Sequence, residues 1–233
     1  MLLFLHGFLG QKEDWDPLFS HLPPTLKPCA IDLPGHGKAP MVDDIALAIK
    51  QQVNSADIIV GYSAGGRLAL ELKSRFPDAF GKVIALSTHP GSLCEKEMKT
   101  RNMWAQMLRS IPLDHFLEKW YDQELFQSLK RHPIFPSMLA RRKNQNPSSL
   151  SQFFMEFSRV KKTAPQVFPE TVFIYGEEDL KYAELYRKLF PIEQIKIENA
   201  GHALHLENPK TTAQVIERLV HEHSRKHQNP STV

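Results

Sequence analysis

Ser63, Asp179 and His202 have the residue types and the chain order needed for a proton relay. A serine hydroxyl becomes an effective nucleophile or base when an imidazole accepts its proton, and the imidazole needs a carboxylate that orients it. The order serine, acid, histidine is the one expected when the serine lies on a sharp strand-to-helix turn. We therefore predict these three residues as the catalytic set.

The turn that carries Ser63 reads Gly61-Tyr62-Ser63-Ala64-Gly65. A Gly-x-Ser-x-Gly string is weak by itself, but here an apolar strand (Asp57–Val60) precedes it and an amphipathic helix (Ala64–Arg75) follows it. That context predicts a nucleophile elbow, in which glycines allow the chain to reverse and expose the serine. The alternative is a plain glycine-rich loop between strand and helix.

Acid and base candidates also follow predicted strands. Glu177, Glu178 and Asp179 come after the strand Thr171–Tyr175, and His202 follows Gly201 after a strand that ends at Ile197. Asp179 is our choice of acid and Glu178 the runner-up. Asp179 would also suit the N-cap of the following helix, which is the structural alternative.

Backbone N–H groups near the serine would form an oxyanion hole. Ala64, directly after Ser63, should supply one donor, and Phe8, in the loop after the first strand, should supply the other. We expect His6 to brace that loop without transferring protons. His36 and His205 are expected to be structural.

Strands that alternate with helices must position these residues. This alternation predicts an α/β fold with a mostly parallel, doubly wound sheet. The expected strands are Leu2–Leu5, Cys29–Leu33, Asp57–Val60, Lys82–Leu86, Thr171–Tyr175 and Gln194–Ile197; the expected helices include Asp43–Asn54, Ala64–Arg75, Tyr182–Leu189 and Lys210–His223.

One segment lacks predicted strands. Residues 89–164 show helical periodicity interrupted by prolines, so we predict a helical cap there, over the sheet edge where such folds bind ligands. The core would comprise residues 1–88 and 165–224. Residues 225–233 are polar and should be a disordered tail.

Composition excludes several functional classes. The chain is 42% hydrophobic and 24% charged, and its net charge is 29 − 26 = +3. That charge is too small to argue for nucleic acid, although clustered arginines would suit an anionic small molecule. No apolar run reaches membrane-spanning length. We expect no nucleic-acid or membrane partner, and a monomer or weak homo-oligomer.

Cysteines and histidines give no sign of disulfides or metal. Cys29 and Cys94 lack a disulfide framework, and the first apolar run lacks the features of a signal peptide, so we expect a reducing cytoplasm. His221, His223 and His227 are expected to be solvated, because no other residue completes a metal-ligand set.

Several motifs resemble those of the α/β-hydrolase superfamily. They are Leu5-His6-Gly7-Phe8, Asp32-Leu33-Pro34-Gly35-His36-Gly37, Gly61 to Arg67, Gly176-Glu177-Glu178-Asp179 and Gly201-His202. More narrowly, the chain is similar to the 2-succinyl-6-hydroxy-2,4-cyclohexadiene-1-carboxylate synthases of menaquinone biosynthesis. That match rests on His6 to Gly10 with Asp14-Trp15, Gly61-Tyr62-Ser63 followed by Gly65-Gly66-Arg67, His89-Pro90-Gly91, Trp120-Tyr121, Arg142-Lys143-Asn144, and Ala200-Gly201-His202 with His205, Glu207, Asn208 and Pro209.

This resemblance implies a lyase and no cofactor. The reaction would remove a proton from a succinylated cyclohexene that carries an enolpyruvyl ether and then eliminate pyruvate, with the triad serine as base. Tyr62, Arg67, Arg101, Trp120 and Arg142 look like the family's substrate-binding residues. Arginines suit the several carboxylates of such a substrate.

Two alternatives remain open. A carboxylesterase, for a small ester or a pimeloyl-carrier methyl ester, would use the same triad covalently. Convergence of the three arginines on one cavity would favour the lyase. A binding protein without catalysis is disfavoured by the intact set of serine, acid and histidine.

Overall fold

The computed structural model describes residues 1–91, 95–158, 168, 170–188 and 193–228. Six strands form one sheet in the order β2-β1-β3-β4-β5-β6, and every adjacent pair is parallel. The strands are β1 (Leu2–Leu5), β2 (Pro28–Ile31), β3 (Ala56–Tyr62), β4 (Phe80–Leu86), β5 (Thr171–Gly176) and β6 (Glu193–Ile197). The predicted parallel α/β architecture is confirmed.

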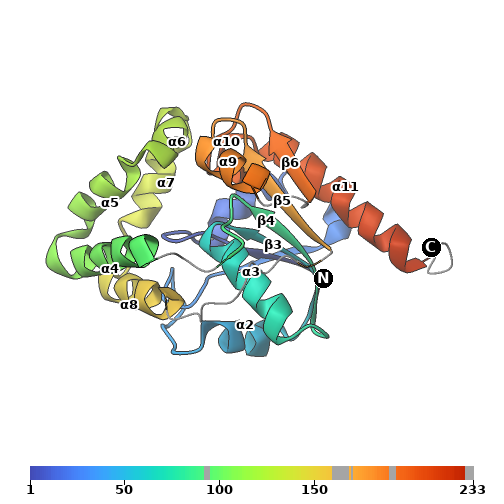
Figure 1. Ribbon diagram of the computed structural model, residues 1–233, viewed down its shortest axis with the longest axis horizontal. Helices are drawn as coiled ribbons and strands as arrows, with labels where there is room; N and C mark the ends of the chain where they lie inside the picture. The colour runs from blue at the N-terminus through green and yellow to red at the C-terminus, as the bar shows by residue number, and fades with distance from the viewer. Residues whose placement is uncertain (92–94, 159–167, 169, 189–192, 229–233) are drawn as a thin grey trace.

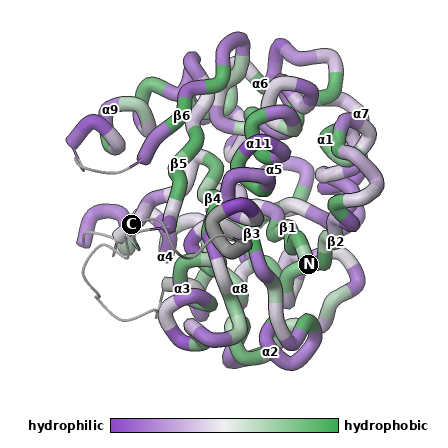
Figure 2. The backbone as a smooth tube through the Cα atoms, turned by 90° about the vertical axis from the view of Figure 1, so that its right-hand side faces the viewer, coloured by the Kyte–Doolittle hydropathy of each residue, from purple (hydrophilic) through white to green (hydrophobic). Residues whose placement is uncertain are grey.

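Buried apolar residues cover both faces of this sheet. The side chains of one face pack against α2 (Ile45–Val53), α3 (Ala64–Arg75) and α9 (Leu180–Lys188). Those of the other face pack against η1 (Lys12–Trp15), α1 (Asp16–Phe19), α10 (Leu204–Glu207) and α11 (Pro209–Gln228). Strands buried on both sides read as continuous apolar runs, and Figure 2 shows β1 and β5 largely in the apolar colour.

The regular elements in the described part of the segment between β4 and β5 are all helices. They are α4 (Glu95–Ser110), α5 (Leu113–Tyr121), η3 (Glu124–Phe126), α6 (Gln127–Arg131), α7 (Phe135–Arg142) and α8 (Pro147–Ser158). Figure 1 shows them as a group beside the sheet, and their apolar residues cluster with Leu9, Ala203 and Leu206 of the core. We call α4 to α8 the cap; Cys94 lies outside the described residues.

The last helix extends further than the sequence predicts. α11 continues to Gln228, into the segment predicted as a disordered tail, and residues 229–233 lie outside the described part of the chain. A short 3-10 helix, η2 (Pro24–Leu26), leads into β2.

The strand order fixes where a site can form. The chain runs from β1 out to β2 at the edge and returns to β3 on the other side of β1. The loops after β1 and β3 therefore diverge at a topological switch point, where open α/β sheets bind ligands. Phe8 and Ser63 lie in these two loops.

Candidate active site

Ser63 occupies a strained turn between β3 and α3. Its φ of 52° lies in the left-handed region, which a side chain rarely adopts, and such strain is concentrated at functional sites. The close packing explains the glycines around it. A Cβ on Gly65 would lie 2.2 Å from the Leu5 carbonyl oxygen, and one on Gly61 would lie 2.5 Å from the Gly65 oxygen.

The predicted catalytic residues meet at the carboxyl edge of the sheet. His202 Nδ1 lies 2.8 Å from Asp179 Oδ2, and His202 Nε2 lies 3.4 Å from Ser63 Oγ. Asp179 and His202 are buried, whereas Ser63 is half-buried. A serine–imidazole distance of this length is common without substrate and shortens when the substrate is bound. The arrangement is that of a Ser-His-Asp relay.

Asp179 has two contacts at once. Its Oδ1 accepts a hydrogen bond from Tyr182 N in the first turn of α9, while Oδ2 faces His202. It therefore caps the helix and orients the imidazole with separate oxygens. Glu178, the alternative acid, points elsewhere and pairs with Arg131 at 2.9 Å on the surface.

The loop that carries His202 is braced by Glu207. One Glu207 carboxylate oxygen accepts from Gly201 N and the other from Ala203 N, each at 3.0 Å. Rings of Tyr62, Tyr182 and Phe126 pack around the imidazole, with centroids 5.1–5.7 Å from it. These contacts leave the imidazole little freedom to rotate.

His6 braces the loop after β1. Leu33 N donates to His6 Nε2 at 2.9 Å, so the proton of the neutral ring lies on Nδ1, which donates to Gly7 O at 2.8 Å. Burial lowers the pKa of His6 to about 4. His36 and His205 are also buried, and burial lowers the pKa of His205 to about 3. Neutral rings of this kind fit structural roles.

Ala64 and Phe8 flank the serine with backbone N–H groups. Ala64 is the first residue of α3, so its N–H has no partner within the helix. Gly7 packs so closely on Tyr62 that a Cβ on it would lie 2.7 Å from the ring. This brings the Gly7–Phe8 peptide to the edge where Ser63 lies, but the role of both donors stays a prediction.

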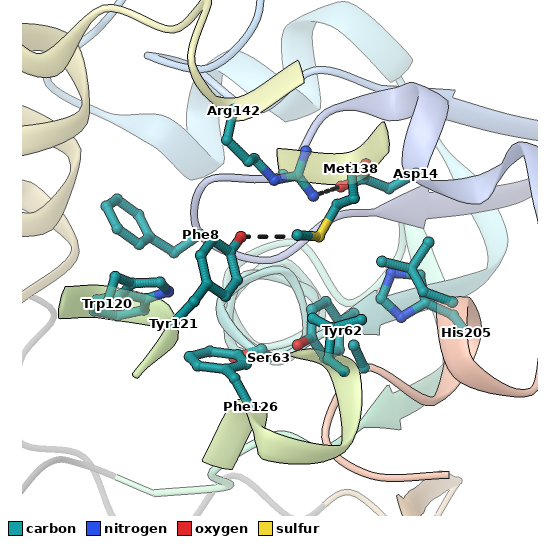
Figure 3. Close-up of a pocket in the computed structure, with 14 residues that line it drawn as sticks. Phe8, Asp14, Tyr62, Ser63, Trp120, Tyr121, Phe126, Met138, Arg142 and His205 are labelled. Atoms are coloured by element: carbon teal, nitrogen blue, oxygen red, sulfur yellow. Dashed lines mark hydrogen bonds and ion pairs between the residues drawn. The ribbon is translucent and has the colours of Figure 1, made fainter. Parts of the chain in front are cut away.

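A cavity of about 30 Å³ opens beside Ser63 (Figure 3). Core and cap both line it, and its walls include three of the predicted binding residues, Tyr62, Trp120 and Arg142. Sequence reasoning named Tyr121 only as part of the Trp120-Tyr121 motif, and it did not single out the other cap residues that line the cavity, which are Phe126, Leu129 and Met138. Apolar residues at helical spacing give no signal that separates such a wall from an ordinary core.

Arg142 is a buried cation at this cavity. It pairs with Asp14, which is equally buried, and Arg141 binds the other Asp14 oxygen at 3.1 Å. Arg142 Nε and Nη1 are buried and make no hydrogen bond of normal geometry within the described part of the chain, although the Tyr121 hydroxyl lies close enough to interact with the guanidinium. Burial alone would lower the pKa of Arg142, but the Asp14 charge raises it, so the guanidinium stays charged. An anionic ligand would find a cation here in a low-dielectric site.

Arg67 and Arg101 form a separate group. Neither lines this cavity; both are half-buried and act electrostatically on Tyr182, whose ring packs on His202. Burial and the nearby Arg67 charge lower the pKa of Arg101 to about 9. Of the three arginines, the cavity beside Ser63 has only Arg142 in its lining, and the substrate-binding roles of Arg67 and Arg101 stay predictions.

The Asp14–Arg142 pair predicts acid sensitivity. Burial would raise the pKa of Asp14, but Arg142 lowers it to about 2. A lowered folded-state pKa contributes stability above the unfolded value near 4, and this stability is lost as the pH falls toward 2. The free energy of unfolding should lose about 2 kcal/mol from this group.

Urea unfolding of wild type and Asp14→Asn between pH 5 and pH 2 measures this contribution. At pH 5 the variant should be less stable by roughly 3 kcal/mol, because the buried Arg142 loses its counter-charge. The gap between the two proteins should narrow as the pH falls. A gap that is independent of pH would contradict the assignment.

The described residues contain no group of three or more His, Cys, Asp or Glu that could hold a metal ion. Within the same residues, no helix is both long enough and apolar enough to cross a membrane.

With its parallel sheet, elbow serine and triad, the chain matches the alpha/beta hydrolase family over residues 2–215, and it belongs to that family. It is 31% identical to the 2-succinyl-6-hydroxy-2,4-cyclohexadiene-1-carboxylate synthase of Citrobacter koseri, over 89% of this chain and 88% of the relative. The synthase of Enterobacter sp. is 29% identical, over 94% of this chain and 91% of that synthase. The resemblance to these synthases is thus confirmed.

Other comparisons concern length and fold. Protein PHYLLO of Arabidopsis thaliana is 28% identical over 89% of this chain, which spans 14% of that longer protein. A structure of MenH from S. aureus superposes with a TM-score of 0.78 at 23% identity, covering 96% of this chain and 94% of that one. An esterase from Thermogutta terrifontis superposes with a TM-score of 0.77 at 17% sequence identity, covering 95% of this chain and 89% of the esterase. These structures share the fold.

Proposed function

We propose that this protein is a carbon-oxygen lyase of menaquinone biosynthesis. It would eliminate pyruvate from 2-succinyl-5-enolpyruvyl-6-hydroxy-3-cyclohexene-1-carboxylate and yield 2-succinyl-6-hydroxy-2,4-cyclohexadiene-1-carboxylate. Arg142 carries the proposal: its guanidinium is buried, lines the cavity of Ser63, and has two nitrogen atoms that make no hydrogen bond of normal geometry within the described residues. The synthases similar to this chain support it.

The names of substrate and product define a 1,4-elimination. The C2–H bond breaks and C2=C3 forms, the C3=C4 bond shifts to C4=C5, and the C5–O bond breaks. Ser63 Oγ takes the C2 proton and passes its own to His202 Nε2, while Asp179 stabilises the imidazolium. His202 then returns a proton to the departing enolpyruvate, which becomes pyruvate.

Negative charge develops on the succinyl ketone oxygen during this step. The N–H groups of Phe8 and Ala64 would stabilise that oxygen, as donors aimed at a developing oxyanion do. Arg142 would hold one substrate carboxylate, and Arg67 with Arg101 would hold another. Tyr62 and Trp120 would line the ring site. Serine acts as base, and no acyl-enzyme forms.

A carboxylesterase is the second candidate. The strained φ of Ser63 and the unpaired N–H at the start of α3 are what an attacking serine and its oxyanion require. A neutral ester, however, would offer no anionic partner to Arg142 Nε and Nη1, which are buried beside the cavity.

Two assays on the wild-type protein separate the candidates. With the lyase substrate we expect pyruvate release, followed by coupled lactate dehydrogenase, and no mass increase of the protein during turnover. With a nitrophenyl ester we expect turnover at least 100-fold slower, because the ester lacks the carboxylates that Arg142 would bind. Rapid ester turnover without pyruvate release would overturn the proposal in favour of the esterase.

A further inference from the structure

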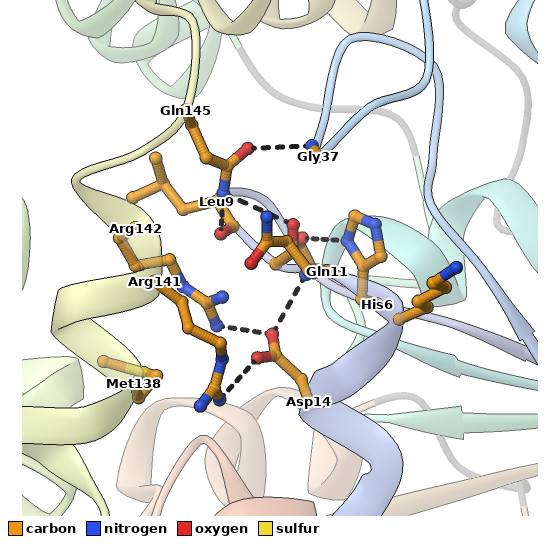
Figure 4. A network of polar contacts seen from close by, with 12 residues as sticks. His6, Leu9, Gln11, Asp14, Gly37, Met138, Arg141, Arg142 and Gln145 are labelled. Atoms are coloured by element: carbon orange, nitrogen blue, oxygen red, sulfur yellow. Dashed lines mark hydrogen bonds and ion pairs between the residues drawn. The ribbon is translucent and has the colours of Figure 1, made fainter.

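Gln145 lies between α7 and α8 of the cap, yet its side chain contacts two loops of the core (Figure 4). Its Nε2 donates to the Leu9 carbonyl and also to the Gly10 carbonyl at 3.4 Å, and its Oε1 accepts from Gly37 N at 3.4 Å. The orientation of the amide is dictated by these partners, since a carbonyl accepts and an N–H donates. Gln145 is buried, so these contacts are shielded from water.

The Leu9–Gly10 peptide connects this contact to the next one. In a planar trans peptide the C=O and N–H point in opposite directions. Gln145 holds the Leu9 C=O on one side, and on the other side Gly10 N donates to Gly7 O at 2.9 Å. Leu9 has a φ of 64°, a left-handed conformation that is unfavourable for leucine and must be held by its surroundings.

The Gly7–Phe8 peptide is the second plane in the series. Its C=O accepts from Gly10 N and from His6 Nδ1, so its orientation is fixed from two directions. Its N–H, on Phe8, therefore points away from both donors. That N–H is the predicted oxyanion donor beside Ser63.

We infer that Gln145 is a positioning residue that orients the Phe8 N–H through these two peptide planes. The connection runs through the Gly10 N–H, so the orientation of the Phe8 donor depends on a side chain of the cap that lies 137 residues further along the chain. The expected effect of Gln145 on elimination rests on the proposed function. Its expected effect on the reactivity of Ser63 does not depend on the natural substrate.

Gln145→Leu tests the inference, because it removes all three side-chain hydrogen bonds of Gln145 at similar volume. We expect kcat for pyruvate elimination to fall about 10-fold with KM changed less than about threefold, since a displaced donor weakens transition-state binding more than substrate binding. The rate constant for labelling of Ser63 by a fluorophosphonate, which also develops charge on an oxygen, should fall by a similar factor.

Gln127→Leu is the matched control. Gln127 is another cap glutamine whose Nε2 donates to main-chain carbonyls, those of Asp122 at 3.0 Å and Gln123 at 3.4 Å, and both of these hydrogen bonds stay within the cap. We expect both rates within twofold of wild type. Gln145→Glu serves if Gln145→Leu fails to fold; its carboxylate would face the Leu9 carbonyl, acceptor against acceptor, and should slow both rates at least as much.

The two assays separate the possible failures. If wild type releases no pyruvate, the proposed function fails, and the labelling rates still decide the inference. If a folded Gln145 variant labels at the wild-type rate, the inference is overturned whatever the substrate. A loss confined to KM would also overturn it, because it would make Gln145 a residue of substrate binding.

Discussion

Asp179→Asn is expected to lower kcat for pyruvate elimination by about 10³- to 10⁴-fold, the loss typical when a triad carboxylate becomes an amide. The Asp179 Oδ2 that faces His202 Nδ1 at 2.8 Å would be replaced by an atom that cannot stabilise an imidazolium. The amide also favours the wrong tautomer, with the proton on Nε2, which then cannot accept a proton from Ser63. Steady-state pyruvate release measures the effect.

Glu178→Gln is the matched control. This neighbouring carboxylate is about half exposed and pairs with Arg131, so its loss should change kcat less than twofold. Thermal unfolding of both variants would show whether Asp179→Asn also loses the cap of α9. If Glu178→Gln proved the more damaging substitution, Glu178 would become the catalytic acid.

Arg142→Met is the second substitution with a large expected effect. It should lower kcat/KM for the carboxylate-rich substrate by roughly 100-fold or more, because a buried charge-assisted contact is lost. It should also destabilise the fold by about 3 kcal/mol, since Asp14 would lose its closest counter-charge while remaining buried. Pyruvate-release kinetics and urea unfolding measure the two losses separately.

The double variant Asp14→Asn with Arg142→Met separates binding from stability. Removing both charges should restore much of the free energy of unfolding, because no uncompensated buried charge remains. It should not restore kcat/KM. Arg141→Met, which removes the partly exposed partner of Asp14, should keep kcat/KM within about threefold. Recovery of kcat/KM in the double variant would show that Arg142 acts through packing alone.

The sequence predicts the fold, and the meeting of Ser63, Asp179 and His202, because the signals for each segment are local. An apolar run followed by glycines and a serine defines β3 and the elbow within ten residues, and α3 spans the predicted Ala64–Arg75. The predicted strand Cys29–Leu33 ends early, at Ile31, because Leu33 N bonds to His6. That hydrogen bond joins residues 27 positions apart and has no local pattern.

The cap wall of the site could not be predicted in the same way. Arg141 and Arg142 are adjacent, and the three-dimensional position of Asp14 decides which one is buried. Gln145 carries no motif, and its partner Leu9 lies 136 residues away. Such contacts depend on how the cap packs on the core, which residue spacing along one segment does not encode.

The order of the strands also bears on how this enzyme family can diversify. The cap leaves the core after β4 and returns at β5, and these strands are neighbours in the sheet. A segment whose ends are adjacent can be exchanged without reconnecting the core, so substrate preference can change while the triad stays intact. In this chain, residues 9–14 bind the cap through Leu9 and Asp14. A new cap would therefore require a matching change in residues 9–14.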